Sequence, residues 1–338
     1  MAPVLSTITS QVAIGVGTIA ITIISGLILK KMLREKVPQE WQQIGTITKL
    51  YIYPLKSAKG IEYDTLVVTE KGVTEPKKND SSLTLRDRSF VMYKPDVKEI
   101  RTARQLPKAF LIEIRAAERG VILSAPNQND IYISIPEVQN NVAVTFGKEV
   151  FICTDCGDAV AKWLSNYLLG EDKGLRLGYG NGSVKRDIRS SNQKLADYYT
   201  NMDNKMAGIF SDLAALHVVN QATIDDLNHH LPDDQQITFN NFRPNILIEG
   251  PEKFAEDDWL YVKFGEVITK VGLECLRCIE TTISSDGVMN KERQPLKMLE
   301  QYRRTKGPFS NGVMGAYLRV LKTGVIHKGD PVYIPKTL

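Results

Sequence analysis

The sequence predicts an α+β protein with a mixed, mainly antiparallel, β-barrel-like core. After residue 44 the chain consists largely of short runs rich in β-branched and aromatic residues, bounded by Gly, Pro or Asn. Helical periodicity occurs in few places, which disfavours a doubly wound parallel sheet with a helix after each strand. A hydrophobic content of 43% and a charged content of 24% over 338 residues are typical of a folded globular protein.

Residues 1–40 are predicted to form an N-terminal transmembrane signal anchor and a basic linker. No charged side chain occurs in residues 2–29, and residues 12–29 form an apolar run. Eighteen helical residues span roughly 27 Å, close to the ~30 Å hydrocarbon thickness of a bilayer. Four basic residues follow within residues 30–36, so the C-terminal side is predicted to face the cytosol. A cleaved signal peptide, the alternative, carries its basic residues before the apolar run.

Short strands are predicted along the rest of the chain. They cover residues 44–53, 65–69, 110–114, 121–123, 131–135, 142–146, 245–248, 260–264, 267–271, 278–283, 316–321 and 332–334. Turn-forming residues separate them, for example Pro54 and the Lys71-Gly72 pair.

Three helices are predicted among these strands. In residues 160–168, apolar side chains recur at spacings of three and four, and Gly170 suits the C-terminal cap. Residues 223–231 and 296–303 are the other two helical segments. Residues 178–205 are rich in Gly, Asn, Ser and Arg without periodicity, which predicts a mobile surface loop.

Composition excludes some classes of function. The net charge is +4, and no dense run of Lys and Arg with interleaved aromatic residues occurs, so nucleic acid is not expected as a partner. Four cysteines in a chain of this length do not form a disulfide framework, which favours a reducing compartment.

Zinc and nucleotide sites are also disfavoured. Cys153 with Cys156, and Cys275 with Cys278, have the spacing of zinc half-sites, but more than a hundred residues separate the two pairs. The four His residues form no H-E-x-x-H motif, and G-x-G-x-x-G, Walker A and G-x-S-x-G motifs are absent from the sequence. Cys153 and Cys275 are predicted to be small buried hydrophobic residues.

A scattered basic set remains, beside predicted turns. It comprises Lys56 with its neighbour Ser57, Arg88, Arg243 and Arg277. Guanidinium and ammonium groups of this kind suit an anionic ligand that carries a phosphate and accepts several hydrogen bonds. Each residue taken alone also fits a solvated surface charge.

Eight short motifs identify a family. They are YPLKSAKG (53–60), LRDR (85–88), TARQ (102–105), DCG (155–157), NFRPN (241–245), AEDDW (255–259), RC (277–278) and GDPVY (329–333). In this order, with the N-terminal anchor, they resemble the MOSC-domain family and within it the mitochondrial amidoxime-reducing components. The resemblance covers nearly all of the chain after the anchor.

The resemblance implies a molybdenum cofactor, Mo-molybdopterin. Cys278 would be the catalytic thiolate that ligates the metal, with Arg277 favouring the ionised thiol. The cofactor-binding residues implied are Lys56, Ser57, Arg88, Asp212, Arg243, Asn245, Arg277 and Cys278. Leu213 and Ala214 stand where hydroxyl residues are usual in the family, so two hydrogen bonds would be missing, or made by backbone N–H groups or water.

The resemblance also implies a division of the chain. Since the implied site residues come from both ends of the soluble part, both ends must close the barrel. The expected parts are the anchor and linker (1–40), a first segment of the MOSC barrel core (44–90), an α/β lobe (91–184) and the MOSC domain with the cofactor site (185–336).

The implied function is that of a membrane-anchored reductase of amidoximes, hydroxylamines and N-oxides. The sequence has no haem or flavin motif, so electrons would come from cytochrome b5 and NADH-cytochrome b5 reductase. The expected location is the outer mitochondrial membrane with the catalytic part facing the cytosol, and the peroxisomal and endoplasmic reticulum membranes are the alternatives. Two other functions stay open: a sulfur carrier that uses a Cys278 persulfide, and a non-catalytic membrane-tethered module that binds the cofactor.

Overall fold

The computed structural model describes residues 36–77, 83–135 and 140–337. Trp41–Lys336 form one compact unit, and the description below concerns this unit by itself. The predicted anchor, residues 12–29, lies outside the described residues. Within the ranges described, no helix combines the length and the apolar character needed to cross a membrane.

The larger sheet closes into a ring. Its strands are β1 (Trp41–Ile52), β2 (Ile61–Tyr63), β13 (Leu216–Asn220), β14 (Ile246–Glu249), β15 (Tyr261–Phe264), β16 (Val267–Leu276), β17 (Val313–Lys322) and β19 (Pro331–Pro335). The order is β14-β13-β17-β16-β15-β19-β1-β2, and β1 also pairs with β14, so seven of these strands complete the ring. β13 and β14 run parallel, whereas β1 is antiparallel to β14, β19 and β2.

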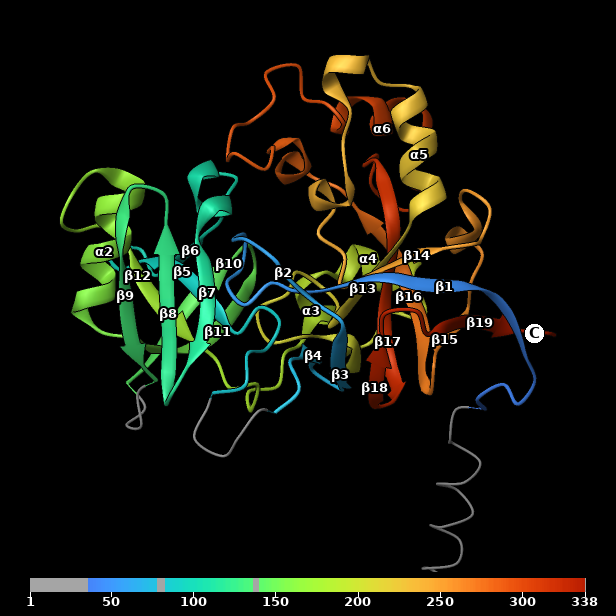
Figure 1. Cartoon of the computed structure of the whole chain (residues 1–338), viewed down its shortest axis with the longest axis horizontal. Coiled ribbons are helices and arrows are strands. Elements are labelled where there is room, and N and C mark those ends of the chain that lie inside the picture. The colour runs from blue at the N-terminus through green and yellow to red at the C-terminus, as the bar shows by residue number, and fades with distance from the viewer. Residues whose placement is uncertain (1–35, 78–82, 136–139, 338) are drawn as a thin grey trace, which may run out of the picture. The chain divides into compact units, whose positions relative to one another are not determined.

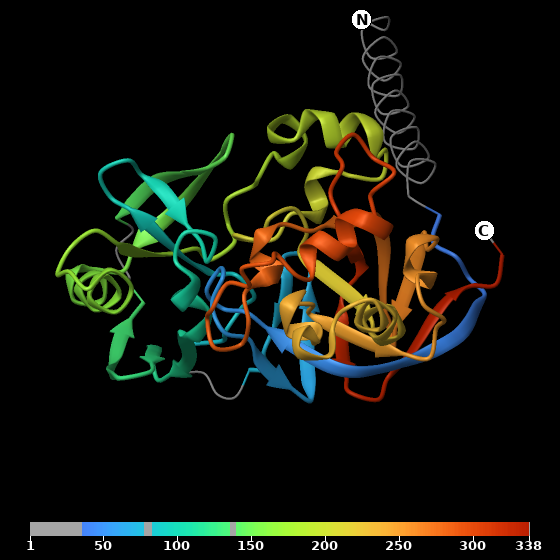
Figure 2. The ribbon, with the colours of Figure 1, turned by 90° about the horizontal axis from the view of Figure 1, so that it is seen from above.

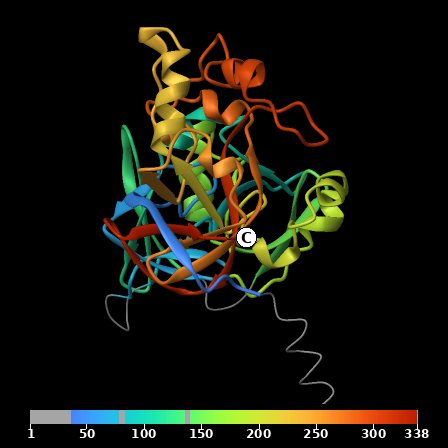
Figure 3. The same ribbon diagram turned by 90° about the vertical axis from the view of Figure 1, so that its right-hand side faces the viewer.

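The first and last strands of the ring lie side by side, blue β1 next to red β19 (Figures 2 and 3). Ile47, Leu50 and Ile52 of β1 pack into the main core, and a register shift between Ile47 and Lys49 interrupts the alternation that would otherwise put Ile47 on the other face. The predicted closure of the barrel by both ends of the chain that follows the predicted anchor is thus confirmed.

A second, smaller barrel lies between these two ends in sequence. It consists of β5 (Phe90–Lys94), β6 (Glu99–Arg101), β10 (Asn141–Phe146), β11 (Glu149–Asp155) and β12 (Arg176–Tyr179), in the order β10-β11-β12-β5-β6. The sheet of β7 (Glu113–Ala117), β8 (Gly120–Ala125) and β9 (Gln128–Ser134) shares its core with α2 (Asp158–Leu169), at the left of Figure 1. A third small sheet joins β18 (Gly324–His327), β3 (Thr65–Thr69) and β4 (Gly72–Thr74).

The prediction of an α/β lobe is therefore wrong in detail, although the mixed α+β class is correct. β10 and β11 form a hairpin in which Phe146 opposes Glu149, and Gly147 in the turn has a φ of 60°. Strands joined by a two-residue turn leave no place for a crossover helix between them. This part closes as a mainly antiparallel barrel, in which β10 pairs with β6 in parallel, with one flanking helix.

The three predicted helices are confirmed. α2 ends at Leu169, Gly170 caps it in the left-handed conformation, and α6 spans Leu296–Tyr302. α5 (Gln221–His229) begins two residues earlier than predicted because the Asn220 side chain accepts a hydrogen bond from the Ala222 backbone N–H. The shorter helical segments are α3 (Ile188–Ser191), α4 (Gln193–Tyr198), η1 (Pro107–Leu111), η2 (Asn204–Met206), η3 (Asp233–Gln235), η4 (Phe239–Asn241), η5 (Ala255–Asp257) and η6 (Ile279–Thr282).

Two segments differ from the predictions. Residues 178–205 contain α3 and α4 and bury Ile188 and Leu195 in a core cluster, so they are not a simple surface loop. Residues 278–283 form η6 instead of a strand, since β16 already ends at Leu276. Cys278 therefore stands at a strand-to-helix turn, as the residue that precedes η6.

Candidate functional site

One cavity collects all eight residues that the sequence analysis singled out. It has an empty volume of about 670 Å³, and its lining includes Lys56, Ser57, Arg88, Asp212, Arg243, Asn245, Arg277 and Cys278. These residues come from turns after β1, before β5, before β13, before β14 and after β16. The structure thus brings them together, while their individual roles stay predictions.

Three of these turns hold a lining residue in the left-handed backbone region. The φ angles are 65° for Ser57, 45° for Arg88 and 53° for Arg243. Residues other than Gly adopt such angles at a cost, and they tend to do so at functional sites. The strained conformation is consistent with side chains aimed into a common cavity.

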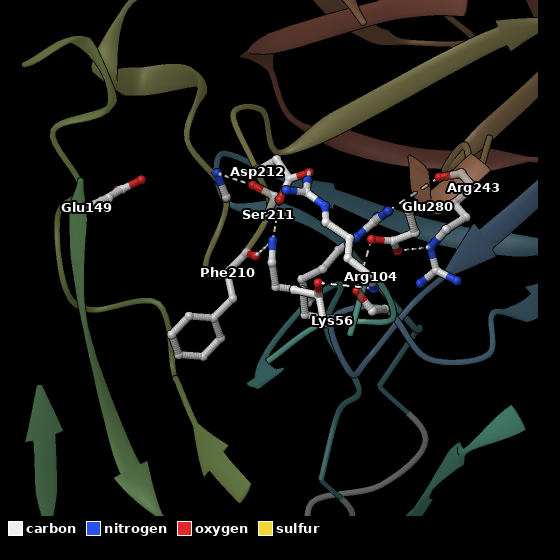
Figure 4. A network of polar contacts seen from close by, with 12 residues as sticks. Lys56, Arg104, Glu149, Phe210, Ser211, Asp212, Arg243 and Glu280 are labelled. Atoms are coloured by element: carbon white, nitrogen blue, oxygen red, sulfur yellow. Dashed lines mark hydrogen bonds and ion pairs between the residues drawn. The ribbon is translucent and has the colours of Figure 1, made fainter. Parts of the chain in front are cut away.

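Lys56 and Asp212 line the cavity and form an ion pair, and their side chains point toward each other (Figure 4). The Lys56 side chain is buried, and its Nζ also donates a hydrogen bond to the Phe210 carbonyl at 2.9 Å. Burial raises the pKa of the Asp212 carboxyl, but the charges of Lys56 and Arg104 outweigh it and hold the pKa well below the usual range. Asp212 therefore stays ionised at neutral pH.

Arg88 and Arg243 lie on the rings of buried aromatic residues. Their guanidinium carbons are 4.6 Å and 4.3 Å from the centre of the Tyr53 ring, and Arg243 is also 4.8 Å from that of Phe110. Arg88 Nη1 is paired with Asp87 at 2.6 Å, whereas Arg243 Nη2 is buried without a hydrogen-bond partner. A buried guanidinium nitrogen without a partner is suited to an anionic ligand.

Arg277 faces Cys275, not Cys278. Its Nη1 donates to the Cys275 sulfur at 2.6 Å and its Nη2 to the Phe242 carbonyl at 2.7 Å. Burial and the nearby Glu280 raise the pKa of the Cys278 thiol, and Arg104 is the cation that most opposes this rise. The field that favours the ionised thiol thus comes chiefly from Arg104 instead of Arg277.

Arg104 and Glu280 are the functional candidates that sequence reasoning missed. Ser57 Oγ donates to Glu280 Oε2 at 3.1 Å, and Arg243 Nε lies 3.7 Å from Glu280 Oε1. Glu280 thus joins two cavity residues, although no role for it could be inferred from the sequence. Its position two residues after Cys278, and that of Arg104 in the TARQ motif, were the available signals.

Leu213 and Ala214 follow Asp212 and both pack in the cluster that contains Ile188 and Leu195. Ala214 also lines the cavity. The structure therefore explains Leu213 as a core residue. A hydroxyl at either position is absent, and Ala214 presents only a methyl group to a ligand.

The cysteines do not form a joint metal site. All four are free, and Cys153 and Cys275 are buried as predicted. In the part of the chain that the structure describes, no three His, Cys, Asp or Glu residues form a group that could hold a metal ion. The two C-x-x-C pairs therefore do not combine into one four-cysteine metal site.

The opposing effects of burial, Glu280 and Arg104 on the Cys278 thiol predict its reactivity in protein from which any bound cofactor has been removed. Replacing Arg104 with Gln removes the main cation that favours the thiolate, so the pKa of Cys278 should rise further and alkylation at pH 8 should slow severalfold. Peptide mass spectrometry after timed iodoacetamide treatment measures this rate. Equal alkylation rates in the unaltered protein and in Arg104→Gln would show that Arg104 does not act on the thiol. Arg119→Gln, at a turn that does not line the cavity, is the control.

Two family models match this chain. Residues 44–171 match the family model of the MOSC N-terminal beta barrel domain, and residues 206–333 match that of the MOSC domain. Mitochondrial amidoxime reducing component 2 of Rattus norvegicus is 30% identical over 329 residues, covering 95% of this chain and 91% of the relative. Mitochondrial amidoxime-reducing component 1 of Homo sapiens is 32% identical over 302 residues, covering 87% and 84%.

These similarities confirm the resemblance that the short motifs indicate. They extend over both barrels and include the turns that carry the cavity residues. The chain belongs to the MOSC-domain family of the mitochondrial amidoxime-reducing components.

Proposed function

We propose that the chain is a molybdenum-cofactor oxidoreductase that reduces amidoximes, hydroxylamines and N-oxides to amidines and amines. The observation that carries this proposal is the single cavity lined by all eight residues that the family motifs single out. The relatives named as amidoxime-reducing components support the same class of reaction.

The residues of the cavity fit a pterin cofactor with a phosphate. Among the described residues, Arg277 Nε is buried without a hydrogen-bond partner, which suits an oxygen atom of a bound anion, and the Arg243 guanidinium lines the same cavity. Lys56 adds a buried ammonium group to the same cavity. Cys278 supplies a soft sulfur ligand of the kind that suits a metal held by dithiolene sulfur. We assign cofactor binding to these residues with Ser57, Arg88, Asp212 and Asn245.

When bound, the cofactor supplies the two-electron redox chemistry that cleaves the N–O bond. The residues of this chain prepare the site for it. Cys278 gives up its proton to act as a thiolate ligand, and Arg104 offsets the burial and the Glu280 charge that oppose this ionisation. Asp212 stays ionised and balances Lys56. Glu280 accepts a hydrogen bond from Ser57 and pairs with Arg243, and so holds both side chains in place.

The reductase also needs electron donors and a location in the cell. Two electrons and two protons convert an amidoxime to an amidine and water, and we propose cytochrome b5 and NADH-cytochrome b5 reductase as their source. We further propose that residues 12–29 anchor the chain in the outer mitochondrial membrane with Trp41–Lys336 in the cytosol. The names of the relatives support mitochondria, and the peroxisomal and endoplasmic reticulum membranes are the alternatives.

The test is reduction of benzamidoxime by the purified full chain with NADH, the reductase and cytochrome b5. We expect NADH oxidation to match benzamidine formation and to stop when cytochrome b5 is left out. Absence of turnover in chain that carries the cofactor would refute the reductase. Sulfane sulfur on Cys278 in chain without molybdenum would favour the sulfur carrier, and cofactor without turnover would favour the non-catalytic module.

A further inference from the structure

A second cleft lies next to the cofactor cavity. It has an empty volume of about 1440 Å³, and Asn241 and Arg243 line both spaces. Its walls come from β1, η1, the segment that contains η3 and η4, and the turn after η6.

Three side chains that line this cleft carry a buried polar atom without a hydrogen-bond partner among the described residues. They are Tyr53 Oη, Arg243 Nη2 and Gln235 Oε1. Tyr53 is only 2% exposed and Arg243 only 8%. Arg243 turns its Nε to Glu280, and both of its Nη atoms point away from Asp212 and Lys56 (Figure 4). Buried polar atoms in folded proteins normally have partners, so three such atoms on side chains that line one cleft indicate a ligand.

The rest of the lining defines the chemistry of that ligand. Rings and apolar side chains form part of the wall, namely those of Tyr51, Phe110, Leu111, Ile237 and Ile283. Side-chain amides, which both donate and accept hydrogen bonds, form another part, namely those of Gln236, Asn240, Asn290 and Gln294. Apolar walls with a few polar groups and one buried cation match a flat ring with a hydrogen-bonding edge and one anionic group.

We propose that this cleft binds a heteroaromatic compound that carries a phosphate or a carboxylate. Arg243 Nη2 takes the oxyanion, and Tyr53 Oη with the Gln235 amide takes the polar edge of the molecule. Because Arg243 lines both spaces, occupation of the cleft is coupled to the cofactor cavity. The proposal does not rest on the reductase function, since the cleft and its unpartnered atoms exist whatever reaction the chain performs.

The test is calorimetric titration of the full chain with two probes, adenosine 5′-monophosphate and pyridine-3-carboxylate. They distinguish the phosphate and the carboxylate as sources of the oxyanion. We expect at least one to bind, with adenosine, pyridine and inorganic phosphate binding at least about tenfold more weakly, because the oxyanion and the ring both contribute. Failure of both probes to bind would overturn the proposal.

Tyr53→Phe keeps the ring and removes only the unpartnered hydroxyl. It should weaken binding of the probe about three- to tenfold, as expected for one hydrogen bond, without lowering the melting temperature. Tyr63→Phe is the matched control, because the Tyr63 hydroxyl donates to Glu75 at 3.0 Å outside the cleft. That variant should lose stability and bind the probe normally. Unchanged affinity in Tyr53→Phe would contradict the assignment.

The titration is repeated on chain with and without bound molybdenum cofactor. Binding in both states, with affinities that differ through Arg243, supports a separate site. Binding to cofactor-free chain alone, with the cofactor displacing the probe, would overturn the proposal, because the cleft would then belong to the cofactor. Binding to cofactor-free chain is measured independently of turnover, so failure of the reductase proposal leaves this test intact.

Discussion

Replacing Cys278 with Ala is expected to abolish benzamidoxime reduction and leave the fold intact. Cys278 lines the cavity at the turn between β16 and η6, and it is the sulfur that we assign to the metal. Loss of residues that only support a metal ligand costs roughly 10- to 100-fold in affinity or activity, so loss of the ligand itself should cost more. The measurement is kcat for benzamidoxime with cytochrome b5 and its reductase, together with the melting temperature.

The matched control for this variant is Cys156→Ala. Cys156 is a free cysteine that does not line the cavity, so its replacement should leave the turnover number unchanged. Full activity in Cys278→Ala would refute the ligand assignment. Equal losses in both variants would point to general damage to the fold instead of loss of a ligand.

Replacing Glu149 with Gln is expected to cause the largest loss of stability. Arg186 is buried against Glu149, with Nε 2.7 Å from Oε1 and Nη2 2.8 Å from Oε2. The variant leaves the Arg186 charge buried without its counter-ion, which costs roughly 3–5 kcal/mol. For a chain of this size the melting temperature should fall on the order of 10 °C, as measured by calorimetry.

The Arg186–Glu149 ion pair also stabilises the segment that carries Asp212 of the cofactor cavity. Arg186 donates to the carbonyl oxygens of Gly208, Ser211 and Asp212, and so holds the segment that presents Asp212. The molybdenum content of Glu149→Gln should therefore fall with its stability. Asp130→Asn is the control, because its pair with Arg115 is about half exposed, with side chains 53% and 51% exposed. A melting temperature in Glu149→Gln equal to that of the control would contradict the prediction.

The fold could be predicted from local patterns wherever those patterns were strong. The β-branched and aromatic residues of β1 and the periodicity of α2 with its Gly170 cap both led to correct elements. Segments 178–205 and 278–283 were misjudged for physical reasons. α3 has four residues, too few to show helical periodicity, and the β-branched residues of η6 resemble a strand although the chain turns there.

The site was predicted from short sequence motifs, which do not show the contacts that residues make in the folded protein. Lys56, Arg88 and Arg243 stand in motifs, so their positions could be inferred although they are far apart in sequence. Arg104 and Glu280 act through contacts that only the closed fold creates. The second cleft could not be foreseen either, because an unpartnered atom such as Tyr53 Oη is a property of packing.

The central claim is that this cavity holds a molybdenum cofactor through Cys278. The most direct measurement is the molybdenum and pterin content of the purified full chain, compared with that of Cys278→Ala. The account predicts equimolar molybdenum and pterin in the unaltered chain and a loss of molybdenum in the variant. A chain that contains neither, after expression in cells that make the cofactor, would contradict it.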